Sequence, residues 1–290
     1  MQLTYGRVPS LSALLRLGRV SNLPTVATNV LTGTALAGGI VWDWHSGLVL
    51  LAMTLFYLGG MYLNDYCDRA IDAQERPQRP IPAGDVSAGV VGGAGLGMLG
   101  LGIALLAATG LAAAILGAAL ALAILGYDAF HKGNPAAPIV MGFCRALVYG
   151  AAAAAVTGTI LFDVALAGLA LLAYVAGLTY AARQESFNRV DNLWPLALLA
   201  VPVVVAWPGF AGAVAVLTYL ALIGCMTAAI YLLAARPIPG AVPRAVGLLI
   251  AGISLLDAAL LAAAGMPGPA LLAALGFPLT LLLHKFVPGT

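Results

Sequence analysis

The 290-residue chain is 62% hydrophobic and only 8% charged, and its formal net charge is +2. Ordinary soluble domains carry about 25% charged residues, so this composition excludes a soluble fold. No basic run indicates nucleic-acid binding, and the three cysteines, which form no close pair, indicate neither a disulfide framework nor a zinc site. A membrane crossing takes about 20 apolar residues, so we expect one all-α integral membrane domain over residues 1–290.

Residues 1–21 place three arginines among several leucines, which is typical of an amphipathic segment at the membrane interface, with a disordered tail as the alternative. Apolar runs with polar interruptions then predict membrane-spanning helices. They lie at 22–41, 47–66, 87–108, 110–128, 135–157, 162–182, 194–207, 211–234, 243–264 and 268–286. The seventh is short and contains Pro202, so we predict a bundle of nine to ten transmembrane helices.

Basic residues fall on one side of this predicted topology. With the N-terminus in the cytoplasm, the outer connections hold no Lys or Arg, and Arg145 alone lies inside a span. The inner connections and ends hold Arg69, Arg76, Arg79, Lys132, Arg183, Arg189, Arg236, Arg244 and Lys285. This bias is the positive-inside signature, and it predicts a multi-pass protein of the cell membrane with its N-terminus and long polar loops in the cytoplasm.

The strongest chemical signal is an acidic motif at the inner end of the second span. Residues 64–72 read Asn-Asp-x-x-Asp-x-x-x-Asp, and at about 100° per residue Asp65, Asp68 and Asp72 fall within roughly 60° of one another, with Asn64 at the margin. Acidic residues at membrane depth are costly and usually functional, and like charges on one face repel unless a cation neutralises them. Magnesium typically binds one or two carboxylates together with substrate phosphates, so the motif predicts a phosphorylated ligand.

A proline-stiffened loop follows the acidic motif. Its sequence, from Arg76 to Gly84, places the guanidinium groups of Arg76 and Arg79 beside the acidic face. Arginine suits bidentate recognition of phosphate. The alternative is an ordinary solvated helix end with ion pairs between these arginines and the aspartates.

These residues resemble the UbiA superfamily of intramembrane prenyltransferases. The resemblance rests on the motif at 64–72 with its Arg-Pro…Arg-Pro-Ile-Pro-Ala-Gly continuation, on 19–24 with Asn29, and on 127–132 followed by Asn134 and Arg145. It implies a central apolar cavity with a polar cytoplasmic cap, in which Mg2+ binds the diphosphate of a polyprenyl donor. The diphosphate then departs, and the allylic cation attacks a small hydrophobic or aromatic acceptor.

The resemblance also implies roles for individual residues. Asn64, Asp65, Asp68 and Asp72 are candidate metal and diphosphate ligands, and Lys132 and Arg145 are candidate diphosphate contacts. The further candidates for substrate binding are Asn22, Asn29, Asn64, Arg76, Arg79, Tyr127, Tyr180 and Arg183. No protein partner is evident.

A second aspartate-rich motif, expected after the sixth span, is absent in its usual form. In its place, residues 180–192 contain Glu185 and Asp191 together with Arg183 and Arg189. Glu185, together with Asn188 or Asp191, is a candidate ligand of a second magnesium ion, although the arginines lower the local negative charge. The alternative for Glu185 is an ion pair with one of those arginines.

Asp257, in the middle of the ninth span, is costly to bury, and both a structural and an acceptor-side role stay open for it. We interpret His131 as an interfacial residue rather than a base.

The predicted function is transfer of an isoprenyl group to a small, aromatic or quinone-precursor acceptor. One alternative is a terpene cyclase of the same superfamily, which uses the same ionisation without an acceptor. Another is a cation-coupled transporter, which we disfavour because carriers usually place such charges near the bilayer midplane.

Overall fold

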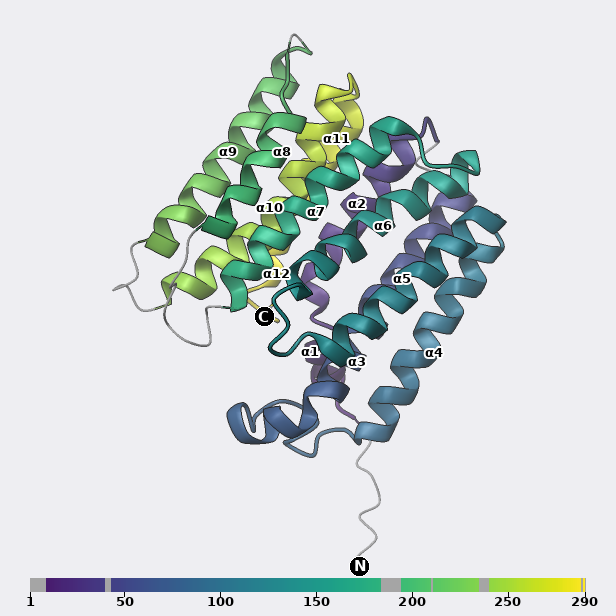
Figure 1. The fold of residues 1–290 in the computed structure, drawn as a ribbon, viewed down its shortest axis with the longest axis vertical. Helices are drawn as coiled ribbons and strands as arrows, with labels where there is room; N and C mark the ends of the chain where they lie inside the picture. Colours follow the sequence, from purple (N-terminus) through teal and green to yellow (C-terminus); the bar gives the residue numbers. More distant parts are fainter. Residues whose placement is uncertain are drawn as a thin grey trace, which may run out of the picture.

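The computed structural model describes residues 9–39, 43–183, 194–209, 211–234, 240–287 and 289, and these form helices and short connections without a strand among them (Figure 1). The helices are α1 (Leu11–Leu17), α2 (Leu23–Leu36), α3 (Trp44–Glu75), α4 (Ala88–Ala107), α5 (Leu111–Phe130), α6 (Ala137–Thr157), α7 (Phe162–Arg183), α8 (Ala200–Val205), α9 (Ala213–Ala234), α10 (Ala241–Ala263), α11 (Pro267–Ala274) and α12 (Gly276–Leu283), with 3-10 turns η1 (Val20–Asn22) and η3 (Trp194–Leu199).

Seven of the described helices are long and apolar enough to cross a membrane, namely α3, α4, α5, α6, α7, α9 and α10. The predicted all-helical membrane bundle is therefore confirmed, but the count of nine to ten crossings is not. Helix α2 has 14 residues, and the predicted seventh span is divided between η3 and α8. The predicted tenth is broken into α11 and α12 at Leu275, because Pro278 has no backbone N–H to bond to the carbonyl four residues earlier.

Helix α3 ends later than the predicted second span. It begins at Trp44 and is capped by Asp43, whose Oδ1 accepts a hydrogen bond from the Ser46 backbone N–H at 2.7 Å, and it continues to Glu75 rather than to residue 66. No glycine or proline interrupts residues 61–76, and Pro77 then disfavours helical backbone at Arg76. The whole acidic motif therefore lies on one continuous helix.

The short helix α1 packs against the same end of the bundle. Ser10 caps it by accepting a hydrogen bond from the Ala13 backbone N–H at 3.2 Å. Leu17 is fully buried, whereas Leu11 is 71% exposed. This two-sided character agrees with the predicted amphipathic segment, of which residues 1–8 lie outside the described part.

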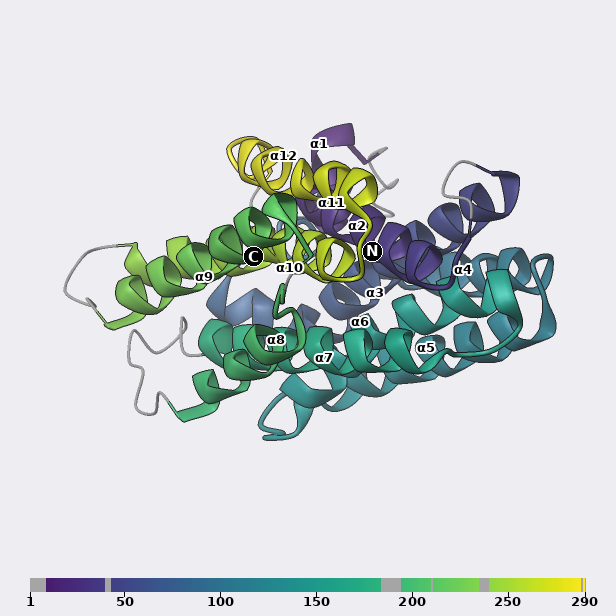
Figure 2. The same ribbon diagram turned by 90° about the horizontal axis from the view of Figure 1, so that it is seen from above.

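The core of the bundle is built around α2 and α10. Residues 251–262 of α10 are buried without a break, and α10 contacts α2, α7, α9, α11 and α12. Figure 2 shows α11, α12 and α1 on one side of the bundle and α5, α6 and α7 on the other, with α2 and α10 between them. Small residues permit these close approaches, as expected where helix association cannot rely on the hydrophobic effect.

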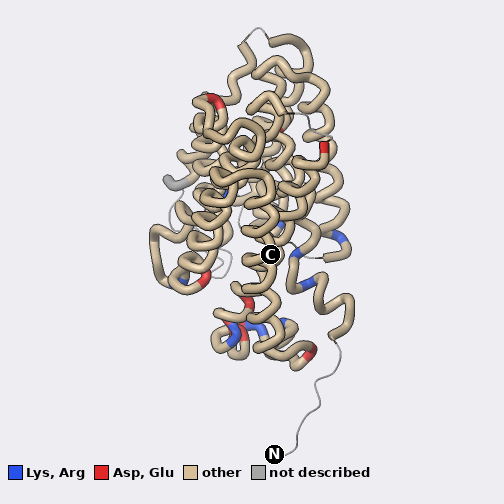
Figure 3. The backbone as a smooth tube through the Cα atoms, turned by 90° about the vertical axis from the view of Figure 1, so that its right-hand side faces the viewer, with Lys and Arg blue, Asp and Glu red and all other residues tan. Residues whose placement is uncertain are grey.

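Charged residues gather toward one end of the bundle, where α3 ends and the loop to α4 begins (Figure 3). The connections at the opposite end, between α4 and α5 and between α6 and α7, contain no Lys or Arg. The fold therefore joins a long apolar body to a charged end.

Gly33 of α2 offers a test of this close packing. A Cβ atom there would lie 2.7 Å from the Tyr149 carbonyl oxygen and 2.9 Å from the Ala152 Cβ, both on α6. We expect Gly33→Ala to separate the two helices and to lower the free energy of unfolding by about 1–3 kcal/mol, measured by thermal unfolding in detergent. The matched control is Gly97→Ala in α4, where a Cβ has no neighbour within 4 Å. It should be neutral or slightly stabilising, and equal effects of the two changes would contradict the packing argument.

Candidate active site

A cavity of about 350 Å³ opens at the charged end and reaches into the bundle. Its polar lining includes Arg19, Asn22, Asn64, Asp68, Arg76, Arg79, Asp128, His131 and Arg145. Its apolar lining includes Val26, Met53, Phe56, Leu120, Ile124, Val148 and Ile253, from helices α2, α3, α5, α6 and α10. One compartment thus combines ionic groups with an apolar interior.

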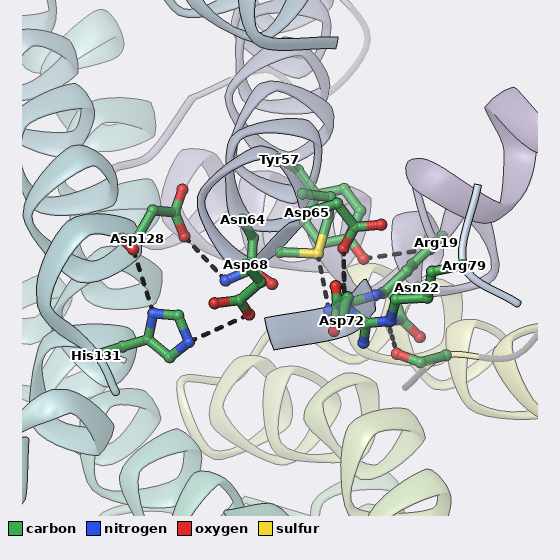
Figure 4. Close-up of polar contacts among 12 residues, drawn as sticks. Arg19, Asn22, Tyr57, Asn64, Asp65, Asp68, Asp72, Arg79, Asp128 and His131 are labelled. Carbon is green, nitrogen blue, oxygen red and sulfur yellow. Dashed lines mark hydrogen bonds and ion pairs between the residues drawn. The ribbon is translucent and has the colours of Figure 1, made fainter. Parts of the chain in front are cut away.

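The acidic face of α3 divides into two edges, and the first is neutralised by arginine. Asp65 Oδ1 accepts hydrogen bonds from Arg19 at 3.3 Å and from Arg79 at 3.2 Å. Asp72 Oδ2 accepts one from Arg79 at 2.8 Å. Asp65 and Asp72 are 5% and 3% exposed, so charge-assisted bonds to guanidinium groups offset much of the cost of their burial. Figure 4 shows this group on one side of α3.

Arg19 reaches Asp65 from a strained backbone position. Its φ of 40° lies in the left-handed region, and it is the one non-glycine residue with positive φ in the described part of the chain. Such a conformation costs about 1 kcal/mol or more and persists where the surroundings enforce it. The Tyr57 hydroxyl donates to the Arg19 carbonyl at 3.2 Å, and η1 follows directly. The strained backbone at Arg19 thus occurs where the neighbouring contacts hold its guanidinium group at the acidic face of α3.

The second edge of α3 carries Asn64 and Asp68, which face the end of α5 (Figure 4). Asp68 Oδ2 lies 3.4 Å from both His131 Nε2 and Lys132 Nζ. The Asn64 side-chain N–H donates to Asp128 Oδ1 at 3.2 Å. His131, which the sequence reading placed at the interface, instead has a side chain that is 12% exposed and lines the cavity. Lys132 is half-exposed.

Arg145 lies deeper, on the wall formed by α6, and not beside the acidic motif. Its guanidinium group donates to Asn29 Oδ1 at 2.9 Å and lies 5.6 Å from the Tyr57 ring centroid. Asn29 in turn donates to both carboxylate oxygens of Asp257, at 2.9 and 3.2 Å, and the Tyr149 hydroxyl donates to the same carboxylate. Asn29, Tyr149 and Asp257 are fully buried. Asp257 is therefore held within a buried polar network, and Arg145 is the member that lines the cavity.

The remaining predicted site residues do not form one group with the acidic motif, and each has its own contacts. Asn22 lines the cavity, accepts a hydrogen bond from His284 Nε2 at 2.8 Å, and donates to the Gly289 carbonyl at 3.0 Å. Tyr127 lines the cavity and stacks on His131 at 5.0 Å between centroids.

Arg76 follows α3 and also lines the cavity. Tyr180 donates to the Pro135 carbonyl at 2.8 Å, between α7 and the loop before α6. Arg183 is the last residue of α7. Glu185 and Asp191 lie outside the described residues, so the predicted second metal site stays a prediction.

Three functional candidates were missing from the sequence-based set: Arg19, Asp128 and His131. All three line the cavity, and all three lie in the segments that carry the family resemblance. The sequence does not show that these residues lie close to the motif at 64–72, because this proximity depends on how η1 and α5 pack against α3.

The charged end offers oxygen donors to a divalent cation. No three His, Cys, Asp or Glu side chains in the described ranges are close enough to hold a metal by themselves. Asp68 and Asp128 nevertheless flank Asn64, and Asp128 Oδ2 is buried without a hydrogen-bond partner among the residues that the structure describes. Such an orphaned buried oxygen calls for a water or an ion. Two carboxylates, an amide and the phosphates of a substrate match the ligand set of Mg2+.

The comparisons with known proteins agree with this geometry. The sequence model of the UbiA prenyltransferase family matches residues 26–236. A digeranylgeranylglyceryl phosphate synthase from Methanothrix thermoacetophila is 41% identical over 75 residues, which are 26% of this chain and 28% of that protein. A protein of the same name from Methanoculleus marisnigri is 38% identical over 78 residues, covering 27% and 28% of the two chains. The chain thus spans about 28% of the length of these curated relatives.

Two solved structures share the fold over most of the chain. The apo structure of a UbiA homologue from Aeropyrum pernix K1 matches with a TM-score of 0.69, over 83% of this chain and 97% of that one, at 19% identity. A structure from a study of digeranylgeranylglyceryl phosphate synthase in membranes matches with a TM-score of 0.64, over 88% and 98%, at 20% identity. At these identities the likeness establishes the fold.

The buried network around Asp257 makes a prediction about stability. Asp257→Asn removes the negative charge that faces Arg145 and replaces an acceptor of the Asn29 and Tyr149 hydrogen bonds by a donor. We expect the free energy of unfolding to fall by about 1–3 kcal/mol, because buried donors lose their partners. Thermal unfolding in detergent measures this loss. The control is Asp163→Asn at the exposed start of α7, and an equal, small effect of both changes would show that Asp257 is not part of a stabilising network.

Proposed function

The chain belongs to the UbiA prenyltransferase family, and we propose that it transfers an isoprenyl group from a polyprenyl diphosphate to a small hydrophobic acceptor in a magnesium-dependent reaction. The observation that carries the proposal is the cavity, in which the ionic end formed by α3, η1 and α5 continues into an apolar interior. An isoprenyl diphosphate has the same division into a polyanionic head and an apolar tail. Head and tail therefore have matching environments in one compartment.

Each edge of α3 supports a part of diphosphate binding. Asn64 and Asp68 supply oxygen donors for Mg2+, with Asp65 and Asp72 as further candidates. Arg79, Arg76 and Lys132 supply cationic groups for the phosphate oxygens, and Arg145 supplies another deeper in the cavity. Arg79 bonds to two carboxylates in the structure, so it exchanges at least one of them for a phosphate when the donor binds.

The reaction breaks the bond between C1 of the isoprenyl chain and the diphosphate oxygen, and the electron pair leaves with the diphosphate. Asn64 and Asp68 would hold Mg2+, which would supply positive charge to neutralise the charge that develops on this leaving group. The cationic side chains stabilise the same charge from fixed positions. Apolar side chains such as Phe56 and Leu120 keep water from the allylic cation. A new bond to the acceptor forms, and the acceptor loses a proton.

Two arguments point to different classes of acceptor. The family resemblance of the sequence indicates an aromatic or quinone-precursor ring. The name shared by the curated relatives refers instead to a glyceryl phosphate with two geranylgeranyl groups. We propose that the acceptor is a small molecule that reaches the apolar part of the cavity beside C1, and the experiment below distinguishes ring from glyceryl phosphate.

We also propose that the charged end faces the cytoplasm. The N-terminal segment together with the inner connections and helix ends of the predicted topology holds every Lys and Arg except Arg145, which is the positive-inside bias. The donor and acceptor heads are then bound from the cytoplasmic side.

The function is tested with purified protein, Mg2+ and isoprenyl diphosphates of several chain lengths. Each donor is supplied with an aromatic acceptor, with a glyceryl phosphate acceptor, or alone. We expect Mg2+-dependent diphosphate release that requires one acceptor class, and a loss of about a hundredfold or more in Asp68→Asn. Asp85→Asn, in the exposed pair with Arg16, is the matched control and should retain activity. Release without an acceptor, together with a cyclic product, would favour the cyclase alternative, and failure to bind any donor would refute both.

The exchange proposed for Arg79 has its own test. Arg79→Gln removes a cation from the diphosphate site, so we expect the KM for the donor to rise by roughly tenfold, the equivalent of one charge-assisted hydrogen bond. Arg69→Gln is the control, because Arg69 lies on the exposed side of the same helix and donates to the Tyr66 carbonyl. Unchanged KM in Arg79→Gln would show that Arg79 serves only to neutralise Asp65 and Asp72.

A further inference from the structure

Asp128, near the end of α5, differs from the other carboxylates at the charged end. Asp65 and Asp72 each have an arginine partner, and Asp68 has His131 and Lys132 within 3.4 Å. No Lys, Arg or His nitrogen of the described residues lies within 4.0 Å of the Asp128 carboxylate. Asp128 is only 6% exposed, so its charge is buried without a cationic partner, a costly arrangement.

The two carboxylate oxygens of Asp128 also differ from each other. Oδ1 accepts the Asn64 hydrogen bond at 3.2 Å. Oδ2 has no hydrogen-bond partner in the described part of the chain, although it is fully shielded from solvent. Asp128 lines the cavity together with Asn64 and Asp68, and Figure 4 shows these three side chains grouped on the side of α3 away from Arg19 and Arg79. Among the described residues, no cation faces the free oxygen of Asp128, and a bound cation would supply the missing partner.

We propose that Asp128 is a direct oxygen ligand of the divalent cation and completes, from α5, a site with Asn64 and Asp68 of α3. The inference rests on the proposed function, which supplies the cation and the diphosphate. It adds a ligand from a different helix, at the position where the chain offers a buried carboxylate oxygen without a partner. It also removes the need for a complete second acidic motif, since residues 180–192 contain only one Glu and one Asp beside two arginines.

Direct ligation has a sharp test in Asp128→Asn. Asparagine can still accept the Asn64 hydrogen bond through its Oδ1, so the substitution removes the charge and one ligand oxygen but keeps shape and local contact. The full-length protein is titrated with Mn2+ in the presence of inorganic pyrophosphate, and bound Mn2+ is followed by electron paramagnetic resonance. We expect a fall in Mn2+ affinity of roughly tenfold or more, whereas Asp163→Asn leaves it unchanged. If Asp128 is instead a protonated structural residue, Asn is nearly isosteric with it and Mn2+ binding stays at the wild-type level, which overturns the proposal.

A metal-preference experiment separates direct ligation from an effect transmitted through Asn64. In a Cys67→Ser, Cys144→Ala background, Asp128→Cys places a thiolate at the site, and thiolates select soft cations. We expect Cd2+ affinity to rise and Mn2+ affinity to fall relative to the same background with Asp128 intact. A loss of both affinities would assign Asp128 an indirect role and refute direct ligation. Absence of any Mn2+ and pyrophosphate binding by the wild type would instead refute the proposed function, so the two failures are distinguishable.

Discussion

The neutralisation of carboxylates buried at the end of α3 is the constraint on which the site depends. A row of acids on one helical face, each nearly inaccessible to water, is stable only if cations come close. The fold brings them from three places: Arg19 from the turn before α2, Arg79 from the loop after α3, and Lys132 from the end of α5. The strained backbone of Arg19 fits this requirement, since its guanidinium group must reach Asp65 from a fixed direction.

The sequence was sufficient for those features that depend on local pattern. Apolar run length predicted most of the spans, and spacing at 100° per residue predicted a shared face for Asp65, Asp68 and Asp72, all of which are buried on α3. The end of α3 was predicted too early, because the start of the polar residues near position 66 was interpreted as the end of the helix, which continues to Glu75. No glycine or proline occurs between residue 61 and Pro77, and the acidic face of α3 is buried inside the protein.

Features that depend on packing between helices could not be predicted. The cavity-facing position of His131 requires the end of α5 to lie against α3 at the level of Asp68. The partnership of Asn29 with Asp257 joins residues 228 apart in sequence, and no periodicity in either helix indicates it. The sequence left both a structural and an acceptor-side role open for Asp257. Its carboxylate accepts hydrogen bonds from Asn29 and Tyr149, which supports the structural role. Arg145, a member of the same network, lines the cavity.

The pairing of the carboxylates with side-chain cations also determines how ligands enter the site. Asp65, Asp68 and Asp72 are already paired in the structure, so the proposed function requires a cation and a diphosphate to replace existing ion pairs at these three carboxylates. A divalent cation at the Asn64–Asp68 edge competes with Lys132 and His131 for Asp68, and it thereby frees Lys132 to bind a phosphate. A diphosphate that attracts Arg79 correspondingly exposes Asp65 and Asp72 to the cation. Each ligand then lowers the cost of binding the other, and by linkage this coupling is reciprocal. The ion pairs also keep Asp65, Asp68 and Asp72 neutralised when no ligand is bound, which these three carboxylates require if they are to remain buried in a membrane-embedded cavity.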